Sequence, residues 1–200
     1  MFTMYKRNVP YLTGLLALLT CSLVVVAPSS ASNGVSQTSN QMSPAATLSY
    51  KSPQGWVAEH PASSMRAAQY KLPKAEGDTE DASLVLYYFG QGQGGTTQAN
   101  IDRWISQMKQ TDGKSPKEGA KLGSLTVNGL KVTTVDVSGT YSAETSPGSG
   151  TFTNNPGYRL RAAVVETPKG SYFAKLIGPE KTVARWDQTF DDYIKSFEFK

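Results

Sequence analysis

The glycine-rich stretch from Gly90 to Gly95 is the part of the sequence whose spacing most resembles a chemical motif. Gly90, Gly92 and Gly95 match the pattern G-x-G-x-x-G between an apolar segment and a segment with helical periodicity. In dinucleotide-binding proteins this pattern brings backbone amides and a helix N-terminus close to a pyrophosphate. Such a fold also needs a second apolar strand after the helix, and here a polar segment follows. We therefore interpret the glycines as a structural turn. A binding site for a smaller anion, formed by Gly90, Gly92, Gly94 and Gly95, is the alternative.

The residue types that most metal sites use are scarce. His60 is the only histidine, and it stands beside a proline, where a surface turn is expected. Cys21 is the only cysteine and lies in an N-terminal segment that we expect to be removed, so zinc, copper and haem lack protein ligands. The carboxylates between Glu76 and Asp81 lack the calcium-loop spacing and are typical of a solvated loop. The sequence thus predicts no metal and no other cofactor.

Groups for nucleophilic or paired-carboxylate catalysis are equally hard to find. No serine lies in a G-x-S-x-G elbow. Asp191 and Asp192 are adjacent, so they cannot face each other on a helix as a catalytic pair. A hydrolase that uses two carboxylates distant in sequence stays an open alternative. The pattern therefore favours a binding module over an enzyme.

Phe152 is a candidate contact residue because it is an apolar side chain in a polar segment. Residues 142–157 read SAETSPGSGTFTNNPG. Long loops in compact domains are either disordered or functional. We expect a flexible connection between two strands. The alternative is a loop that becomes ordered on a partner, with Phe152 as the anchor.

The N-terminus has the pattern of a secretory signal peptide. Lys6 and Arg7 precede an apolar run over residues 11–26, and small residues follow up to Ala31. Residues 1–31 are therefore predicted to be a signal peptide, and the protein to be exported to the periplasm or the extracellular space. A retained membrane anchor is disfavoured because the apolar run is short for a bilayer span. We expect no membrane span after processing.

Cys21 offers a second interpretation of the same segment. The residues before it faintly resemble a lipobox, in which a lipid is attached to the cysteine. Threonine is unusual directly before such a cysteine, and the apolar run continues beyond it. A lipid anchor at Cys21 is therefore the minor alternative to a cysteine-free exported protein.

The remaining chain divides into a tether and one domain. Residues 32–47 are rich in Ser, Asn, Gln and Thr and are expected to be flexible. Residues 48–200 have the composition of a single globular domain, long enough to bury a core without disulfides. The formal net charge of +4 includes two residues of the signal peptide, and no Lys/Arg cluster marks a nucleic-acid surface. Nucleic acid is not an expected partner.

A strand, the glycine turn and a helix form the predicted centre of the domain. Residues 84–89 are all apolar or aromatic, which predicts a strand that is buried on both faces. Thr96 or Thr97 is suited to cap the helix that follows. The stripe that this helix buries consists of Ile101, Trp104, Ile105 and Met108.

Antiparallel strands account for most of the other predicted elements. Asn128-Gly129 favours a type I′ turn and hence a tight hairpin. A helix is expected to begin at Pro179, with Trp186 as its anchor to the sheet. The other predictions are two short strands around the turn 52–55, a half-buried strand over 65–72, a surface loop over 111–121, and a hairpin of 158–167 with 171–177.

Several motifs resemble those of known proteins. The opening Tyr50-Lys51-Ser52-Pro53-x-Gly55-Trp56 and the ending at Ser196-Phe197 resemble PsbP-like proteins, the extrinsic subunits of the photosystem oxygen-evolving apparatus, whose fold the Ran-binding Mog proteins share. A group of uncharacterised exported bacterial proteins is more similar still, through Tyr88-Phe89-Gly90-x-Gly92-Gln93-Gly94-Gly95, Asn100-Ile101-x-Arg103-Trp104, Gly139-Thr140-Tyr141 and Tyr172-Phe173-Ala174-Lys175-Leu176-x-Gly178-Pro179. The resemblance implies an α+β fold, an αβα sandwich with a central antiparallel sheet and a helix on each face. It implies no photosystem role, because one fold hosts many functions.

Two functions remain in view from the sequence. The first is a non-catalytic exported module that binds a protein or assists assembly at the cell envelope. The second is a small-molecule or anion binder, or an enzyme that acts on such a ligand, that uses residues 90–95. The oligomeric state is left open by the sequence.

Overall fold

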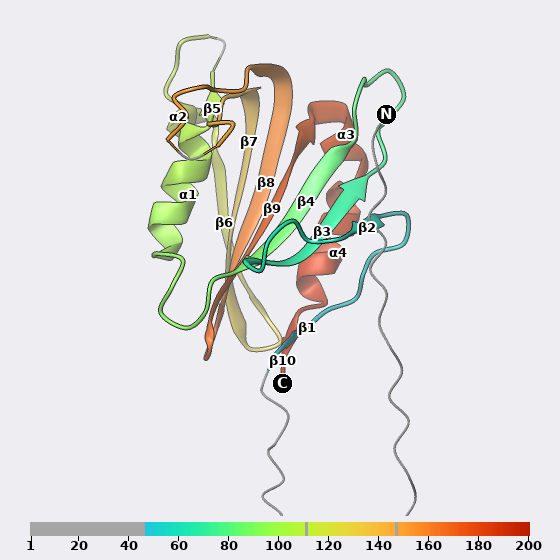
Figure 1. The fold of residues 1–200 in the computed structure, drawn as a ribbon, viewed down its shortest axis with the longest axis vertical. Helices are drawn as coiled ribbons and strands as arrows, with labels where there is room; N and C mark the ends of the chain where they lie inside the picture. Colours follow the sequence, from blue (N-terminus) through green and yellow to red (C-terminus); the bar gives the residue numbers. More distant parts are fainter. Residues whose placement is uncertain (1–46, 111, 147) are drawn as a thin grey trace, which may run out of the picture. The chain divides into compact units, whose positions relative to one another are not determined.

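An antiparallel sheet forms the centre of the domain, and helices cover it on both faces (Figure 1). The structure is a computed structural model, and it describes residues 47–110, 112–146 and 148–200 (Figure 1). The predicted signal peptide 1–31, with Cys21, and residues 32–46 of the predicted tether lie outside the described residues. Within the described ranges, each helix is too short or too polar to cross a bilayer.

Strands make up most of the regular secondary structure of the described chain, and helices follow β4, β5 and β9. The strands are β1 (Leu48–Ser49), β2 (Val57–Glu59), β3 (Arg66–Leu72), β4 (Ala82–Tyr88), β5 (Met108–Lys109), β6 (Lys121–Val127), β7 (Leu130–Tyr141), β8 (Asn155–Thr167), β9 (Gly170–Pro179) and β10 (Glu198–Phe199). The helices are α1 (Thr97–Ser106), α2 (Pro116–Gly119), α3 (Glu180–Arg185) and α4 (Asp187–Lys195). The main sheet has the order β2-β3-β4-β9-β8-β7, and both β5 and β6 pair with β7.

Alternation along the central strands produces two hydrophobic cores, one on each face of the sheet. On β8, Leu160, Ala162 and Val164 pack on the side of α1, whereas Ala163 and Val165 pack on the side of α3 and α4. Successive residues of a strand point to opposite faces, so a strand between two helical layers needs apolar residues at every position. The predicted α+β sandwich with an antiparallel sheet is confirmed.

The helix α1 covers its face as the periodicity predicts, except that Met108, the last residue of the predicted stripe, is buried in β5 after the helix has ended. The Thr96 hydroxyl accepts a hydrogen bond from the Ala99 amide at 3.1 Å and caps the helix. Ile101, Trp104 and Ile105 are buried against β7, β8 and β9. Burial of this stripe is the main reason that a helix of only three turns is stable here.

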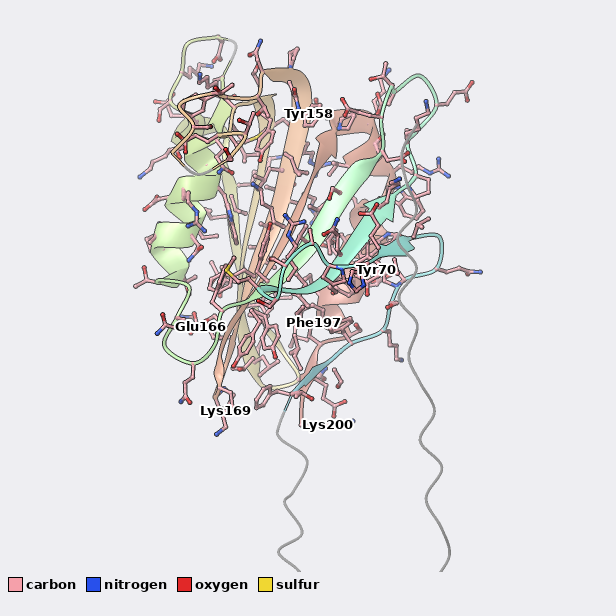
Figure 2. The ribbon with its side chains drawn as sticks, in the orientation of Figure 1. Tyr70, Tyr158, Glu166, Lys169, Phe197 and Lys200 are labelled. Carbon is pink, nitrogen blue, oxygen red and sulfur yellow. The ribbon has the colours of Figure 1, made fainter. Side chains whose placement is uncertain are left out.

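The opposite face carries two helices where one was predicted. The chain breaks at Trp186, whose backbone angles (φ −102°, ψ 9°) end α3 and begin α4. Trp186 is only half-buried, and its indole N–H donates to the Pro73 carbonyl at 2.9 Å. Trp186 packs against the core of this face, as the prediction of an anchor requires, although it is only partly buried. Phe190, Tyr193 and Phe197 are buried more deeply in the same core, to which Tyr70 also belongs (Phe197 and Tyr70 are labelled in Figure 2).

An ionic network fixes α4 to the sheet. Arg159 on β8 donates to both carboxylate oxygens of Asp136, at 2.8 and 2.6 Å, and to Asp187 at 3.0 Å. Arg161 donates to Asp187 at 3.1 Å and to Asp191 at 2.7 Å. The hydrogen bond from Arg159 to Asp136 raises the pKa of the guanidinium further above its usual range. Each positive charge is thus neutralised by carboxylates within the protein.

The turn predictions have mixed outcomes. Asn128 and Gly129 both take positive φ, 47° and 81°, and join β6 to β7 as predicted. The hairpin of β8 with β9 is also confirmed. The two short strands around residues 52–55 exist but do not pair with each other, because β1 pairs with β10 and β2 pairs with β3. The predicted loop 111–121 contains the one-turn helix α2, which Ser115 caps.

Candidate functional site

A cleft of about 200 Å³ lies on the α1 face of the sheet, beside the glycine-rich turn. Side chains from β4, β9 and α1 surround it, together with Phe89 and Gln107, which follow β4 and α1. Half of the lining side chains are aromatic, and the others carry amides or positive charges. The lining residues are Tyr87, Phe89, Asn100, Arg103, Trp104, Gln107, Phe173 and Lys175.

Lys175 reaches this cleft because of its position in β9. Phe173 and Lys175 point toward α1, whereas Ala174 and Leu176 belong to the core on the other face. Directly opposite Lys175 are Val85 on β4 and Ala162 on β8, both buried. Cross-strand neighbours share a face of the sheet. The lysine stem is therefore embedded between two apolar side chains in the middle of the sheet.

The ammonium group of Lys175 has neutral partners. Its Nζ donates to Gln107 Oε1 at 2.7 Å and to the Tyr141 hydroxyl at 3.2 Å, and it lies 5.0 Å from the centroid of the Tyr141 ring. Among the described residues, Lys175 takes part in no ion pair with a carboxylate. Burial, and then the positive charge of Arg103, lower the pKa of Lys175 to about 8. An anion in the cleft would supply the missing partner.

Arg103 connects the cleft to the glycine-rich turn. Its Nη2 donates to Asn100 Oδ1 at 2.5 Å. The amide nitrogen of Asn100 in turn donates to the carbonyls of Gly94 at 2.8 Å and Thr96 at 2.9 Å. Asn100 is 2% exposed, so it is held in this orientation. The turn thus positions the guanidinium through one buried amide.

The glycines of the turn have different environments. A Cβ on Gly94 would lie 2.7 Å from Phe89 Cδ2 and 2.8 Å from Phe173 Cε2. Gly94 therefore packs against two aromatic rings that line the cleft. A Cβ on Gly92 would have no heavy atom within 4 Å. Gly90 and Gly95, like these two, have positive φ. The structure gives Gly94 a packing role, and ligand binding by the four glycines stays a prediction.

Phe152, the predicted contact residue, lies outside this cleft. Its side chain is 57% exposed. The surrounding segment forms a small hairpin, in which Thr145 N donates to Thr151 O at 2.9 Å and Thr153 N donates to Ala143 O at 2.8 Å. The described part of the segment is thus a hairpin connection between β7 and β8, as expected, and its flexibility stays a prediction. Contact of Phe152 with a partner stays a prediction.

The acidic run from Glu76 to Asp81 has a structural role at two positions. Asp78 accepts hydrogen bonds from the amide of Thr182 at 2.9 Å and from its hydroxyl at 2.6 Å, which supports the first turn of α3. Asp81 accepts from the Lys74 amide at 2.8 Å. Over the described ranges, His, Cys, Asp and Glu nowhere gather in threes with the spacing of a metal site.

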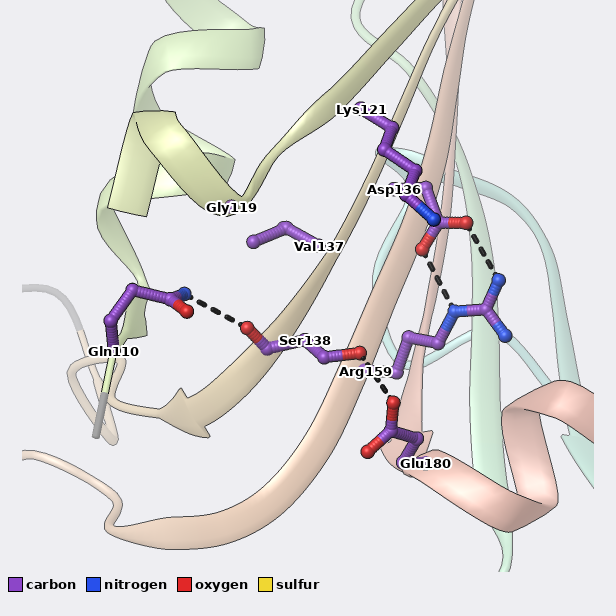
Figure 3. A pocket seen from close by; sticks show the side chains of 8 residues that line it. All are labelled: Gln110, Gly119, Lys121, Asp136, Val137, Ser138, Arg159 and Glu180. Atoms are coloured by element: carbon purple, nitrogen blue, oxygen red, sulfur yellow. Dashed lines mark hydrogen bonds and ion pairs between the residues drawn. The ribbon is translucent and has the colours of Figure 1, made fainter. Parts of the chain in front are cut away.

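A larger and more polar pocket of about 420 Å³ lies at the sheet edge near the start of β6 (Figure 3). Three of its charged side chains, Asp136, Arg159 and Glu180, already have partners within the protein. Arg159 forms a bidentate pair with Asp136, and the Ser138 hydroxyl donates to Glu180 at 2.8 Å. Gln110 donates to the backbone carbonyl of Ser138 at 2.9 Å. These contacts join β7, β8, α3 and the residue that follows β5, and they engage Asp136, Arg159 and Glu180 within the protein.

Sequence reasoning missed Lys175 and Arg103 as site residues. A signal for Lys175 was present, since it is the one charged residue in the run Tyr172-Phe173-Ala174-Lys175-Leu176-Ile177. A buried strand seldom contains a lysine without a reason. Arg103 had no such signal, because an arginine on the polar side of a helix is ordinary.

Comparison with known proteins leaves the chain without a family. No family model matches it, and no curated protein matches it. One similar solved structure is LpqN, involved in cell envelope biogenesis of Mycobacterium tuberculosis, at 12% identity over 80% of this chain and 87% of LpqN, with a TM-score of 0.49. Another is a Pseudomonas aeruginosa protein of unknown function, at 15% identity over 70% of this chain and 94% of that protein, with a TM-score of 0.40. Neither similarity bears on a ligand or a partner, and the resemblance to PsbP-like proteins stays a prediction.

Proposed function

We propose that this protein is an exported, non-catalytic binding module of the cell envelope that holds a small organic anion in the Lys175 cleft. The observation that carries the proposal is the charge of the cleft. Lys175 and Arg103 both line it, and none of its lining residues is a carboxylate. By contrast, Arg159 and Arg161 on the other face of the sheet are each neutralised by aspartates.

The size and walls of the cleft narrow the class of ligand. A cavity of about 150 Å³ lined by apolar side chains binds benzene. A volume of about 200 Å³ therefore suits one aromatic ring with one or two small substituents. Phe89, Trp104 and Phe173 offer ring faces and edges for such a body, and a carboxylate is the natural partner of a lysine and an arginine. A small aromatic acid meets all of these requirements.

The export and envelope parts of the proposal rest on the N-terminal sequence pattern. In this proposal the glycine-rich turn does not bind the ligand itself but holds Arg103 in place, since Asn100 is hydrogen-bonded to both Gly94 and Arg103. The alternative is that the backbone amides of residues 90–95 bind a phosphate directly. Binding through the side chains of α1 and β9 needs no catalytic group.

A thermal-shift screen of the purified protein tests the proposal. The panel contains benzoate, phenylacetate, inorganic phosphate and the neutral analogue benzamide. We expect benzoate and phenylacetate to raise the melting temperature, since a ligand at 100 times its dissociation constant adds about 2.7 kcal/mol to the free energy of unfolding. Benzamide should have a much smaller effect.

Two variants in the cleft and one matched control locate the binding. Arg103→Ala and Lys175→Met should lose the benzoate-induced shift. Lys181→Met removes an exposed lysine of α3, which packs on the opposite face, and should keep it. No shift with either acid, or an equal shift in both cleft variants, would contradict the proposal. A shift with phosphate alone, lost in Gly92→Ala, would favour anion binding by the glycine-rich turn.

A further inference from the structure

The amine of Lys175 is placed beside a hydroxyl that can move a proton. Its Nζ lies 3.2 Å from the Tyr141 hydroxyl, and Tyr141 stacks on Tyr158 with a ring separation of 6.2 Å and an interplanar angle of 7°. Burial raises the pKa of the Tyr141 phenol, so the group keeps its proton at neutral pH. A half-buried lysine that forms no ion pair with a carboxylate among the described residues, in contact with a protonated phenol, has the arrangement of an activated amine nucleophile.

We propose that Lys175 forms an imine with carbonyl compounds that enter the cleft, and that the Tyr141 hydroxyl assists as the proton donor. This inference rests on the proposed function, because it uses the same cleft and the same anionic ligands. It names their reactive class: small aromatic acids that also carry an aldehyde or a ketone.

The reaction balances without any oxidant or reductant. The lone pair of the neutral Lys175 nitrogen attacks the carbonyl carbon, and the carbonyl oxygen takes a proton to give a carbinolamine. The first nitrogen proton passes to the oxygen in this step. Tyr141 then protonates the carbinolamine hydroxyl, which leaves as water while the nitrogen lone pair forms the C=N bond. The second nitrogen proton passes to the Tyr141 phenolate, so the products are a neutral imine, one water and the regenerated phenol. Hydrolysis reverses every step, so the imine is a means of reversible capture.

Attack needs the neutral form of the amine. With a pKa of about 8, about a fifth of Lys175 is neutral at pH 7.4, against less than about a hundredth for an ordinary lysine. The charged and titratable groups around the Lys175 amine are Arg103 from α1, Tyr141 from β7 and Tyr87 from β4, with Arg66 of β3 over the Tyr87 ring at 5.9 Å. The positive charge of Arg103 favours the neutral amine.

Arg103 and Lys175 would contact opposite ends of the ligand. A carboxylate paired with Arg103 leaves the carbonyl end of the molecule for Lys175, and the ring lies against Phe173. The compound 4-formylbenzoate has these groups on a single ring and serves as the probe. Benzaldehyde, which has the same reactive group and lacks the carboxylate, serves as the control compound.

Reductive trapping tests the inference. The purified protein is incubated at pH 7.4 with limiting 4-formylbenzoate and sodium cyanoborohydride, and the adduct is located by peptide mass spectrometry. We expect one carboxybenzyl group on Lys175, formed at least about tenfold faster than on any other lysine. Equal labelling of the exposed lysines, or none at Lys175, would overturn the inference.

Two variants separate the roles of the neighbours. Tyr141→Phe should slow trapping about tenfold or more, because the proton donor is lost while the ring and its packing remain. Arg103→Ala should slow trapping of 4-formylbenzoate and leave trapping of benzaldehyde nearly unchanged. An unaltered trapping rate in Tyr141→Phe would remove Tyr141 from the reaction and contradict the inference as stated.

The failure of this inference is distinguishable from the failure of the proposed function. Benzoate binding that depends on Arg103 and Lys175, without trapping at Lys175, overturns the imine alone. Trapping of benzaldehyde at Lys175 in a protein that does not bind benzoate overturns the anion site alone. Absence of both results overturns both.

Discussion

Replacing Gly94 by alanine is expected to lower the free energy of unfolding by about 3 kcal/mol, whereas the same change at Gly92 should cost about 1 kcal/mol. Both residues have positive φ, 87° and 70°, so both alanines carry backbone strain. Only the Cβ at position 94 would collide with Phe89 and Phe173, at 2.7 and 2.8 Å. The rings belong to the cleft wall and the core, so they cannot move freely.

Urea unfolding of the two variants and the parent protein measures this difference. Equal destabilisation at the two positions would show that Gly94 has no special packing role. The comparison also decides how the turn should be probed for ligands. A bulky residue at position 94 disturbs Phe89 and Phe173 directly, so loss of binding there says nothing about the backbone amides. Gly92→Ala, with open space around the new methyl group, is the clean test of the turn.

Replacing Lys175 by methionine is expected to raise the free energy of unfolding at pH 7 by up to about 3 kcal/mol. The reason is the cost of a buried cation. In the unfolded chain Lys175 has the ordinary pKa of 10.5, and burial lowers it to about 8 in the folded protein. Below pH 8 the folded state therefore keeps a charge that burial disfavours, and methionine removes that charge while filling the same space.

The same shift predicts how stability depends on pH. Between about pH 8 and pH 10.5 the unfolded chain binds the Lys175 proton and the folded protein does not, so the stability contributed by this group rises with pH. Near and above pH 10 the buried tyrosines act in the opposite direction. Burial raises the pKa of Tyr50 to about 12, so unfolding releases protons there and stability falls. The window from pH 8 to pH 10 isolates the lysine.

Urea unfolding at several pH values between 7 and 10 checks this prediction. The parent protein should gain stability relative to Lys175→Met as the pH rises, and Lys181→Met should behave as the parent does. Parallel pH profiles for the parent and Lys175→Met would mean that the Lys175 amine is well solvated. The proposed imine chemistry would then lose its source of neutral amine.

Local patterns predicted the centre of this fold well. The apolar run at 84–89, the Thr96 cap and the stripe that includes Trp104 all act over a few residues, and the structure contains the strand, the cap and the helix. The Asn128-Gly129 hairpin is equally local, because two positive φ angles suffice to define it. Alternation and turn chemistry are readable wherever one face of a short element decides its position.

Long-range pairing was beyond the same patterns. Leu48 pairs with Phe199, at the other end of the chain, although a turn directly after β1 suggests a local hairpin. The break at Trp186 was also hidden, since apolar residues on both sides of it continue the helical spacing. The candidate site was hidden for the same reason, because its residues come together only through tertiary contacts. Lys175 meets Gln107 and Tyr141 only after β9 lies in the middle of the sheet and α1 is packed on top of it.

An NMR titration of the purified protein with benzoate tests the central claim most directly. The claim is that the cleft between α1, β4 and β9 holds a small aromatic acid. We predict saturable shifts at the Gln107 side-chain amide, the Trp104 indole and the Arg103 guanidinium, with the signals of Phe152 and Asn128 unchanged. Shifts confined to the segment around Phe152 or to the glycine-rich turn, or no saturable shift at all, would contradict it.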